Sequence, residues 1–375
     1  MHYLDHNATS PLRPEARAMM ERALSIGGNP SSVHGAGRDA RAMIEHAREQ
    51  VAGLVGTRAR DVIFTSGGTE ANALALRGAI EGALEANERI TRLFVSSIEH
   101  DSVLANATAI AERVPGLRIE TIPVSPDGVV DLETLRVKLR EGKGRALVAA
   151  MAANNETGVM QPIAELSVLA REASALLLID AVQVVGKVET HLVAADYISL
   201  SAHKIGGPQG VGALVVRDGA PFACQTLGGG QENGMRAGTE NVSGIAGFGA
   251  AAHVARAAPA QLRDRFERQL PKFAVVFGSA VARLPNTSNF ALPGIAAESA
   301  VMALDLDGVM VSSGAACSSG KVKPSHVLKA MGVPDDLARC ALRVSFGWNS
   351  TEEDVDAAID SIARMVARVG KREAA

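Results

Sequence analysis

Apolar residues recur along the chain at two spacings, one typical of helices and one typical of strands. From Gly37 to Val55 they stand three and four residues apart, and Gly56 follows them as a stop signal. That spacing places the apolar residues on one face of a predicted helix. A second helical stripe begins after Ser350-Thr351-Glu352-Glu353, which has the pattern of a capping box. We expect this terminal helix to end at Gly370.

Short apolar runs that end in polar residues predict the strands. They are Asp61 to Phe64, Leu93 to Ser97, Ala146 to Met151, Leu176 to Ile179 and Tyr197 to Leu200. From about residue 56 to 255 these runs alternate with helical patterns, which is typical of a mostly parallel sheet covered by helices. After about residue 258 the elements become shorter. The sequence therefore predicts an α/β fold with a large domain and a second, smaller domain.

Polar side chains gather where the predicted strands end. The sequences that follow the apolar runs include Glu99-His100-Asp101, Asn154-Asn155-Glu156-Thr157-Gly158, Asp180-Ala181-Val182-Gln183 and Ser201-Ala202-His203-Lys204. Taken singly, each has an ordinary structural explanation, such as a helix cap or a partly buried histidine. Because the carboxyl ends of parallel strands meet at one edge of a sheet, we expect these side chains to share one site.

The stretch Thr65-Ser66-Gly67-Gly68-Thr69-Glu70 joins a predicted strand to a helical pattern from Ala71 to Leu84. Free N–H groups at a helix N-terminus attract an anion, and Thr69 adds a hydroxyl group. The stretch is not a P-loop, because no GxxxxGK[ST] occurs in the chain. A threonine here is also a common helix cap. Considered with the other strand ends, the stretch is a candidate phosphate cradle.

Lys204 is the candidate nucleophile of this edge. A partly desolvated lysine amine loses its proton easily and can form a Schiff base with a carbonyl group. Ser201 and His203 could hold an anion beside it, and Gly206 and Gly207 leave room for a bulky ligand. A lone loop lysine is usually just solvated, so the assignment depends on the neighbouring strand ends.

A Schiff-base lysine, an acid after a buried strand, an imidazole and a phosphate cradle together suit pyridoxal phosphate. In this interpretation the Asp180 carboxylate keeps the pyridine nitrogen protonated, so that the ring can accept electrons. His100 can stack on the ring. The glycine turn at Gly67 and Gly68 binds the phosphate with its N–H groups and the nearby hydroxyl.

Composition narrows the classes of function. The chain has 375 residues, 47% of them hydrophobic and 21% charged, which is ordinary for a globular protein. A net charge of −3 and only 3% aromatic residues argue against nucleic-acid binding. The apolar runs are too short to span a membrane, and we see no signal peptide. Cys224, Cys317 and Cys340 have no CxxC or zinc spacing, so we expect no metal and a reducing, cytoplasmic environment.

The order of these motifs resembles the pyridoxal-phosphate-dependent cysteine desulfurases of the nitrogen-fixation and iron–sulfur-cluster type, within the class V aminotransferase superfamily. The resemblance covers nearly the whole chain. Beyond the motifs above, it includes Tyr3 to Thr9, Asn29 to His34, Gly228 to Glu232, Arg236 to Thr239 and Ser312 to Cys317. It implies the type I fold of pyridoxal-phosphate-dependent transferases. In that fold a large domain (residues 16–258) holds a mostly parallel seven-stranded sheet, and a smaller α+β domain (1–15 and 259–375) carries the cysteine loop.

The resemblance also implies a role for each matching residue around the cofactor ring. Lys204 would form the Schiff base, and Asp180 would pair with the pyridinium. Gln183 would donate to the phenolic oxygen of the ring. His100 would stack on the ring and shuttle protons.

Further roles concern the phosphate and the substrate. The phosphate would be bound by Gly68, Thr69, Ser201 and His203, joined by Thr239 from the other subunit of a homodimer. Asn155 and Arg343 would hold the substrate carboxylate, for which a planar guanidinium is well suited.

Cys317 would take sulfur from L-cysteine and carry it as a persulfide to an iron–sulfur scaffold or another acceptor protein, leaving L-alanine. A thiol is only a few per cent ionised at pH 7, so it needs a base or a positive field. Cys224 and Cys340 have bulkier apolar neighbours, and we expect them to be structural. The alternatives are a selenocysteine lyase or aminotransferase on the same scaffold, or a non-catalytic scaffold that binds sulfur carriers. Cys317 and its loop favour the desulfurase over the lyase and the aminotransferase, and Lys204, Asp180 and Cys317 together argue against the non-catalytic scaffold.

Overall fold

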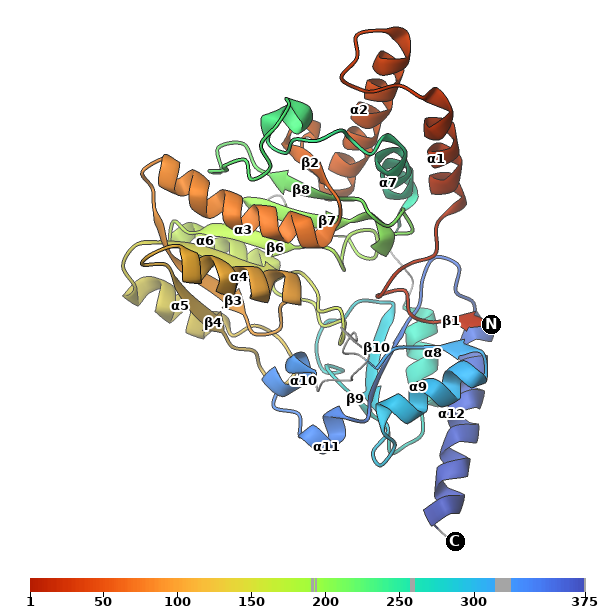
Figure 1. Ribbon diagram of the computed structural model, residues 1–375. Coiled ribbons are helices and arrows are strands. Elements are labelled where there is room, and N and C mark those ends of the chain that lie inside the picture. Colours follow the sequence, from red (N-terminus) through yellow and green to blue (C-terminus); the bar gives the residue numbers. More distant parts are fainter. Residues whose placement is uncertain (190–191, 193, 257–259, 314–324, 374–375) are drawn as a thin grey trace.

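A seven-stranded sheet organises the larger part of the molecule (Figure 1). The structure is a computed structural model that describes residues 1–189, 192, 194–256, 260–313 and 325–373. The strand order is β2-β8-β7-β6-β5-β3-β4, and β8 alone runs antiparallel to its neighbours in this sheet. The predicted mostly parallel α/β fold is therefore confirmed. The strands are β2 (Val62–Thr65), β3 (Ile90–Ser96), β4 (Arg118–Ile122), β5 (Arg145–Met151), β6 (Leu176–Asp180), β7 (Tyr197–Ser201) and β8 (Gly212–Val216).

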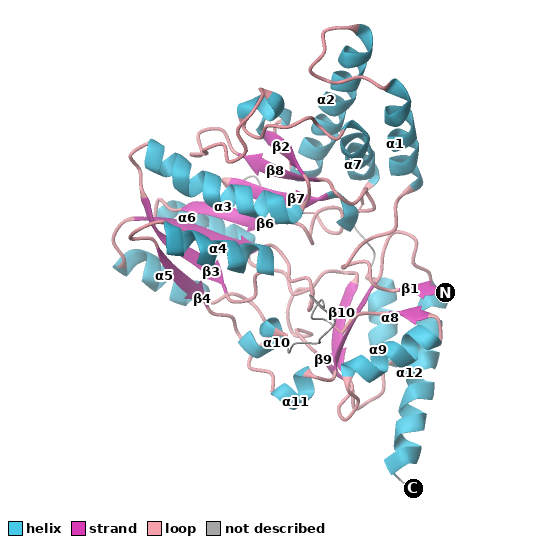
Figure 2. Cartoon of the chain, in the orientation of Figure 1, coloured by secondary structure: helices cyan, strands magenta, loops and turns pink. Residues whose placement is uncertain are grey.

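Helices cover both faces of this sheet (Figure 1, Figure 2). One face packs against α3 (Gly68–Glu85) and α4 (Asp101–Arg113). The opposite face packs against α2 (Gly35–Val55), α5 (Leu132–Glu141), α6 (Ile163–Glu172) and α7 (Val242–Val254). Because both faces are buried, the central strands are apolar almost throughout rather than alternating.

The alanine and glycine content of α7 reflects close helix packing. α7 lies against α2 and against α1 (Pro14–Ile26). A Cβ atom at Gly249 would lie 2.5 Å from the Cα of Ala47 on α2. A larger residue at that position would force the two helices apart.

A second hydrophobic core lies beside the sheet. It contains a three-stranded antiparallel sheet of β9 (Val275–Val276), β10 (Thr287–Ala291) and β12 (Ala341–Ser345). The N-terminal arm joins this part, because β1 (His2–Tyr3) pairs in parallel with β11 (Val309–Met310). The helices here are α8 (Gln261–Gln269), α9 (Ala297–Leu306), α10 (His326–Ala330), α11 (Asp335–Ala338) and α12 (Glu352–Glu373). The smaller α+β unit is thus present, while the domain boundaries at residues 16 and 258 stay a prediction.

The terminal helix differs from the prediction at both ends. It begins at Glu352, and its capping contact lies one residue later than the predicted box of Ser350 and Glu353, because the Thr351 N–H donates to Asp354 Oδ2 at 2.8 Å. The helix continues to Glu373, so the predicted stop at Gly370 was wrong. A single glycine costs a helix only about 1 kcal/mol relative to alanine, which does not suffice to end it. Among the described residues, no helix has the length and apolar character needed to cross a membrane.

Candidate active site

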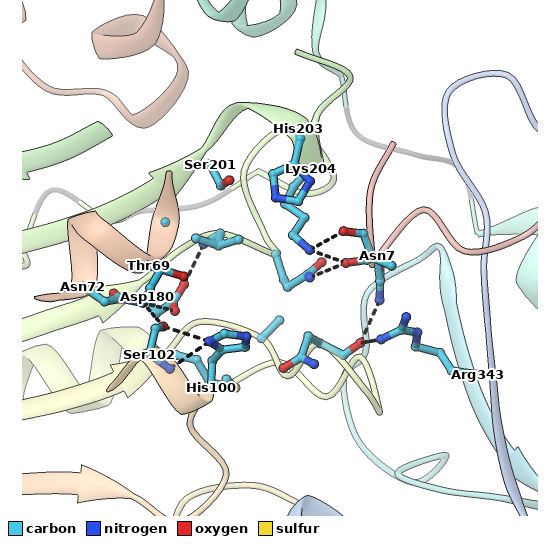
Figure 3. Close-up of a pocket in the computed structure, with 17 residues that line it drawn as sticks. Asn7, Thr69, Asn72, His100, Ser102, Asp180, Ser201, His203, Lys204 and Arg343 are labelled. Atoms are coloured by element: carbon cyan, nitrogen blue, oxygen red, sulfur yellow. Dashed lines mark hydrogen bonds between the residues drawn. The ribbon is translucent and has the colours of Figure 1, made fainter. Parts of the chain in front are cut away.

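The carboxyl ends of the parallel strands form one side of a cavity of about 310 Å³, and the N-terminal arm and β12 close the other side (Figure 3). Most of the predicted site residues meet here. Those that line the cavity are Gly68, Thr69, His100, Asn155, Asp180, Gln183, Ser201, His203, Lys204 and Arg343.

Two predicted residues are not among those that line the cavity. Thr239 is exposed and lines a smaller cavity with Ser66 and Arg236, so its predicted role requires a second copy of the chain. Cys317 lies outside the described residues. The other two cysteines are free thiols, with Cys340 buried and Cys224 partly exposed.

Lys204 lies in η2 (Ala202–Lys204), the helical turn that follows β7. Its Nζ donates to the backbone carbonyls of Asn7 and Ala8, each at 2.7 Å (Figure 3). Burial, together with the positive charge of Arg343, lowers the pKa of Lys204 from 10.5 to about 8. The neutral amine is therefore accessible near neutral pH, as a nucleophile at this position requires.

Asp180 ends β6 and is held by donors on both carboxylate oxygens. Its Oδ2 accepts from Asn72 Nδ2 at 2.8 Å, and its Oδ1 accepts from the Val182 N–H at 3.0 Å. The Asn72 amide also donates to Ser102 Oγ and accepts from Ser199 Oγ. This network fixes the direction in which the carboxylate faces the cavity (Figure 3).

A second carboxyl group lies buried near Asp180. Glu99 is 0% exposed, and its Oε1 accepts from the Met151 N–H at 2.7 Å. Burial, with the Asp180 carboxylate as the next cause, raises the pKa of Glu99 well above its usual range. This shift disfavours a second negative charge beside Asp180.

His100 is the N-cap residue of α4 and has a defined tautomer when neutral. Its Nδ1 accepts from the Ser102 N–H at 3.0 Å, and Ser102 Oγ lies 2.8 Å from the same nitrogen. A nitrogen that accepts a hydrogen bond carries no proton, so the proton of the neutral ring is on Nε2. The His100 ring therefore presents an N–H donor at its other edge.

The candidate phosphate cradle forms where α3 approaches the ends of β6 and β7. The close approach requires glycine, because a Cβ at Gly68 would lie 2.9 Å from Val182 Cγ2 and 3.4 Å from Ser201 Cβ. Burial, then the charge of Lys204, lowers the pKa of His203 to about 4, so its ring is neutral at pH 7. Its Nδ1 lies 3.1 Å from Thr9 Oγ1. Together with the α3 N-terminus and Thr69, these groups can donate hydrogen bonds to an anion.

Arg343 comes to the cavity from β12 and is 3% exposed. It forms an ion pair with Asp5, and one of its Nη atoms donates to the Asn155 carbonyl at 2.9 Å. Its buried Nε has no hydrogen-bond partner among the described residues. A buried donor without a partner is costly, which suits a guanidinium that receives a ligand carboxylate.

Sequence reasoning missed the residue that links the two sides of the cavity. Asn7 is 1% exposed and bonds to Lys204 through its carbonyl, and to Asn155 and Thr287 through its side-chain amide. Asn72 was missed as well. Asn7 lies in the Tyr3–Thr9 motif, but its partners are more than a hundred residues away, so no local spacing indicates its role.

The cavity fits pyridoxal phosphate as a single ligand. Its volume is in the range of small-molecule sites. Among the described lining residues Asp180 is the one carboxylate, while Lys204 and Arg343 supply positive charge. A cavity lined by two cationic side chains and one acid suits a ligand that carries a phosphate at one end and a basic ring nitrogen at the other.

Comparisons with known proteins agree with this geometry. Residues 2–358 match the family model described as Aminotransferase class-V. The chain is 40% identical to "Cysteine desulfurase IscS" of Dictyoglomus turgidum, over 98% of this chain and 95% of that protein. It is 44% identical to "Cysteine desulfurase" of Cereibacter sphaeroides, over 97% of this chain and 95% of that protein.

A solved structure shows the same fold. The NifS-like protein from Rickettsia africae superposes with a TM-score of 0.87 and 33% identity, covering 98% of this chain and 99% of that chain. The chain belongs to the class-V aminotransferase family and, within it, to the pyridoxal-phosphate-dependent cysteine desulfurases.

Proposed function

We propose that this protein converts L-cysteine to L-alanine and transfers the sulfur to its own Cys317 as a persulfide, for iron–sulfur cluster assembly or other sulfur delivery. The observation that carries the proposal is the meeting of Lys204, Asp180 and Arg343 in one cavity. The curated relatives named cysteine desulfurase, at 40% and 44% identity, support the same reaction.

Bound pyridoxal phosphate supplies an electron sink that weakens the bonds at the substrate α-carbon. The residues of this chain bind and orient the reactants. Asn155 and Arg343 would hold the substrate carboxylate, and Asp180 would pair with the ring nitrogen. Lys204, with a pKa of about 8, holds the cofactor covalently and exchanges protons when its amine is free. His100 would donate a hydrogen bond or a proton from its Nε2–H, because its Nδ1 already accepts from the Ser102 N–H.

The sulfur step balances without an external oxidant. The Cβ–S bond of the substrate breaks while a new S–S bond forms to Cys317 Sγ. The transferred sulfur is oxidised to the persulfide level, and the substrate carbon is reduced as it gains a proton and becomes the alanine methyl group. Cysteine and one thiol thus give alanine and one persulfide. Cys317 must be a thiolate to attack, so a base or positive field has to act on it.

The proposal includes a homodimer, in which Thr239 of each chain completes the phosphate site of the other. It is supported by the exposure of Thr239, which does not line the cavity of its own chain. Thr239→Ala should weaken cofactor retention without changing the mass measured by light scattering. A fully active monomer would contradict the shared site.

The acceptor protein and the location also belong to the proposal. An iron–sulfur scaffold or another sulfur acceptor would collect the persulfide from Cys317. A cytoplasmic, reducing location is supported by Cys224 and Cys340, which are free thiols. Pull-down from extracts of the source cells, with and without persulfide loading, tests the acceptor.

The deciding experiment incubates the purified holoenzyme with L-cysteine and dithiothreitol and measures alanine and sulfide. We expect equal amounts of both. Ketoacid-dependent amino transfer without sulfide would favour an aminotransferase, and turnover of selenocysteine alone would favour a lyase. A colourless protein with no turnover would favour the non-catalytic scaffold.

A further inference from the structure

Lys187 is a second buried lysine close to the active site, with no assigned role. It is 6% exposed and does not line the active cavity. It lines a separate cavity of about 340 Å³, and Lys204 lines both cavities. Lys187 can therefore act on the cofactor site only through the residues it touches.

The amine of Lys187 bonds to two side-chain amides. Its Nζ donates to Gln183 Oε1 at 2.6 Å and to Asn7 Oδ1 at 3.0 Å. Gln183 and Lys187 are four residues apart in the turn after β6, so their side chains lie on the same side. Gln183 lines the active cavity, and Asn7 bonds to Lys204 (Figure 3).

These contacts leave Gln183 only one orientation. A lysine amine placed at 2.6 Å as a donor requires the amide oxygen to face it. The other end of the amide must then be the NH₂ group, and Gln183 Nε2 does donate to the Asn7 carbonyl at 3.0 Å. An amide NH₂ has two protons, so one remains for an acceptor in the active cavity.

The surroundings of Lys187 contain several other basic groups. Lys204 and Arg343 act on it electrostatically, His6 and His203 respond to its charge, and Arg13 and Arg256 line the same cavity. No carboxylate of the described residues is within ion-pair distance of it. Burial, followed by these charges, lowers the pKa of Lys187 well below its usual range.

We propose that Lys187 is a positioning residue for the cofactor site, which fixes the Gln183 amide with its NH₂ group turned to a negatively charged oxygen of the bound cofactor. This inference rests on the proposed function, because it requires a cofactor that carries such an oxygen beside Gln183. Without Lys187, the amide can rotate and present its oxygen instead, which would repel that negative charge.

The test is a pH titration of the visible absorbance of the holoenzyme. Hydrogen bonding to a charged oxygen favours the less protonated state of the bound cofactor. Lys187→Met removes the donor while keeping an unbranched side chain of similar length. We expect its titration midpoint to lie higher than that of the parent by roughly one pH unit. Lys329→Met, at an exposed lysine on α10, is the matched control and should titrate like the parent.

A double-mutant cycle separates positioning from a general structural effect. If Lys187 acts through Gln183, then Lys187→Met should shift the midpoint in the parent and add little in a Gln183→Ala background. Lys187→Gln keeps one amide donor and should give an intermediate shift of the midpoint. It replaces Lys187→Met in the test if the methionine variant folds poorly.

The outcomes distinguish this inference from the proposed function. A parent protein without visible absorbance contradicts the proposed function itself. A parent that titrates normally, with Lys187→Met and Lys187→Gln unshifted, overturns the role of Lys187 alone. Equal shifts in the parent and in the Gln183→Ala background also overturn it, because Lys187 would then act independently of Gln183.

Discussion

Two lysines of this protein share Asn7 as a partner but face different surroundings. Lys204 bonds to the Asn7 backbone carbonyl and lines the cavity that contains Asp180. Lys187 bonds to the Asn7 side chain and is enclosed by amides and basic groups. The comparison shows that burial alone does not make a lysine a nucleophile. Access of the amine to a cavity that can hold a carbonyl compound decides the role.

Replacing Lys204 should have the largest effect. Lys204→Ala removes the amine that we propose holds the cofactor, so alanine formation should fall at least about 10⁴-fold. The visible absorbance should disappear or shift to that of non-covalently bound cofactor. Lys187→Met should keep a covalently bound cofactor. Alanine production at the parent rate by Lys204→Ala would remove the distinction between the two lysines.

Replacing Cys317 tests the sulfur-transfer step, which is separate from the proposed roles of Lys204 and Lys187. Cys317→Ala should keep the cofactor content and the first spectral change on adding cysteine, since Lys204, Asp180 and Arg343 are intact. Sulfide release should fall by orders of magnitude, because the sulfur has no acceptor. Cys224→Ala and Cys340→Ala are the controls and should cost little activity. Sulfide at the parent rate from Cys317→Ala would contradict the thiol relay.

Both lysine amines donate hydrogen bonds to Asn7. Asn7→Ala deletes one of the two acceptors of Lys187 and the donors to Asn155 and Thr287. We expect unfolding free energy to fall by about 1–3 kcal/mol and kcat/KM by about tenfold. Asn29→Ala, at a turn where Asn29 accepts from the Ser31 N–H, is the control. Unchanged denaturation and kinetics in Asn7→Ala would mean that the two lysines are not coupled through this residue.

The smallest effect concerns the pH dependence of cofactor capture. Burial lowers the pKa of Lys204 to about 8, so the reactive neutral amine increases as the pH rises through that value. The rate at which the apoprotein takes up pyridoxal phosphate covalently should increase from pH 6.5 upward and level off above about pH 8. Stopped-flow absorbance measures this rate. A midpoint near 10.5, the ordinary lysine value, would show that burial does not tune the amine.

The side of the cavity formed by the ends of the strands could be predicted from the sequence. Asp180, His100 and Lys204 each follow an apolar run, and parallel strands place their carboxyl ends together. The α/β fold follows from the same alternation of strands and helices. Local pattern was sufficient here because each residue is placed by the strand immediately before it.

The other side of the site could not be predicted in this way. Asn7 reaches Lys204, Asn155 and Thr287 across long stretches of chain, and Asn72 reaches Asp180 from a helix of ordinary pattern. Such contacts depend on how the arm and helices pack against the sheet. The hydrogen bond between Lys187 and Gln183 does have a local signal in the sequence, because the two residues are four positions apart. Their burial, however, depends on tertiary packing and could not be predicted from that spacing.

The central claim is that Lys204, and not Lys187, holds the cofactor. Treating the holoenzyme with borohydride makes the bond between lysine and cofactor permanent, and peptide mass mapping then locates it. We expect the added mass on the peptide containing Lys204, in near-stoichiometric yield, with the Lys187 peptide unmodified. Modification of Lys187, or of no lysine, would contradict the assignment of Lys204 as the lysine that holds the cofactor.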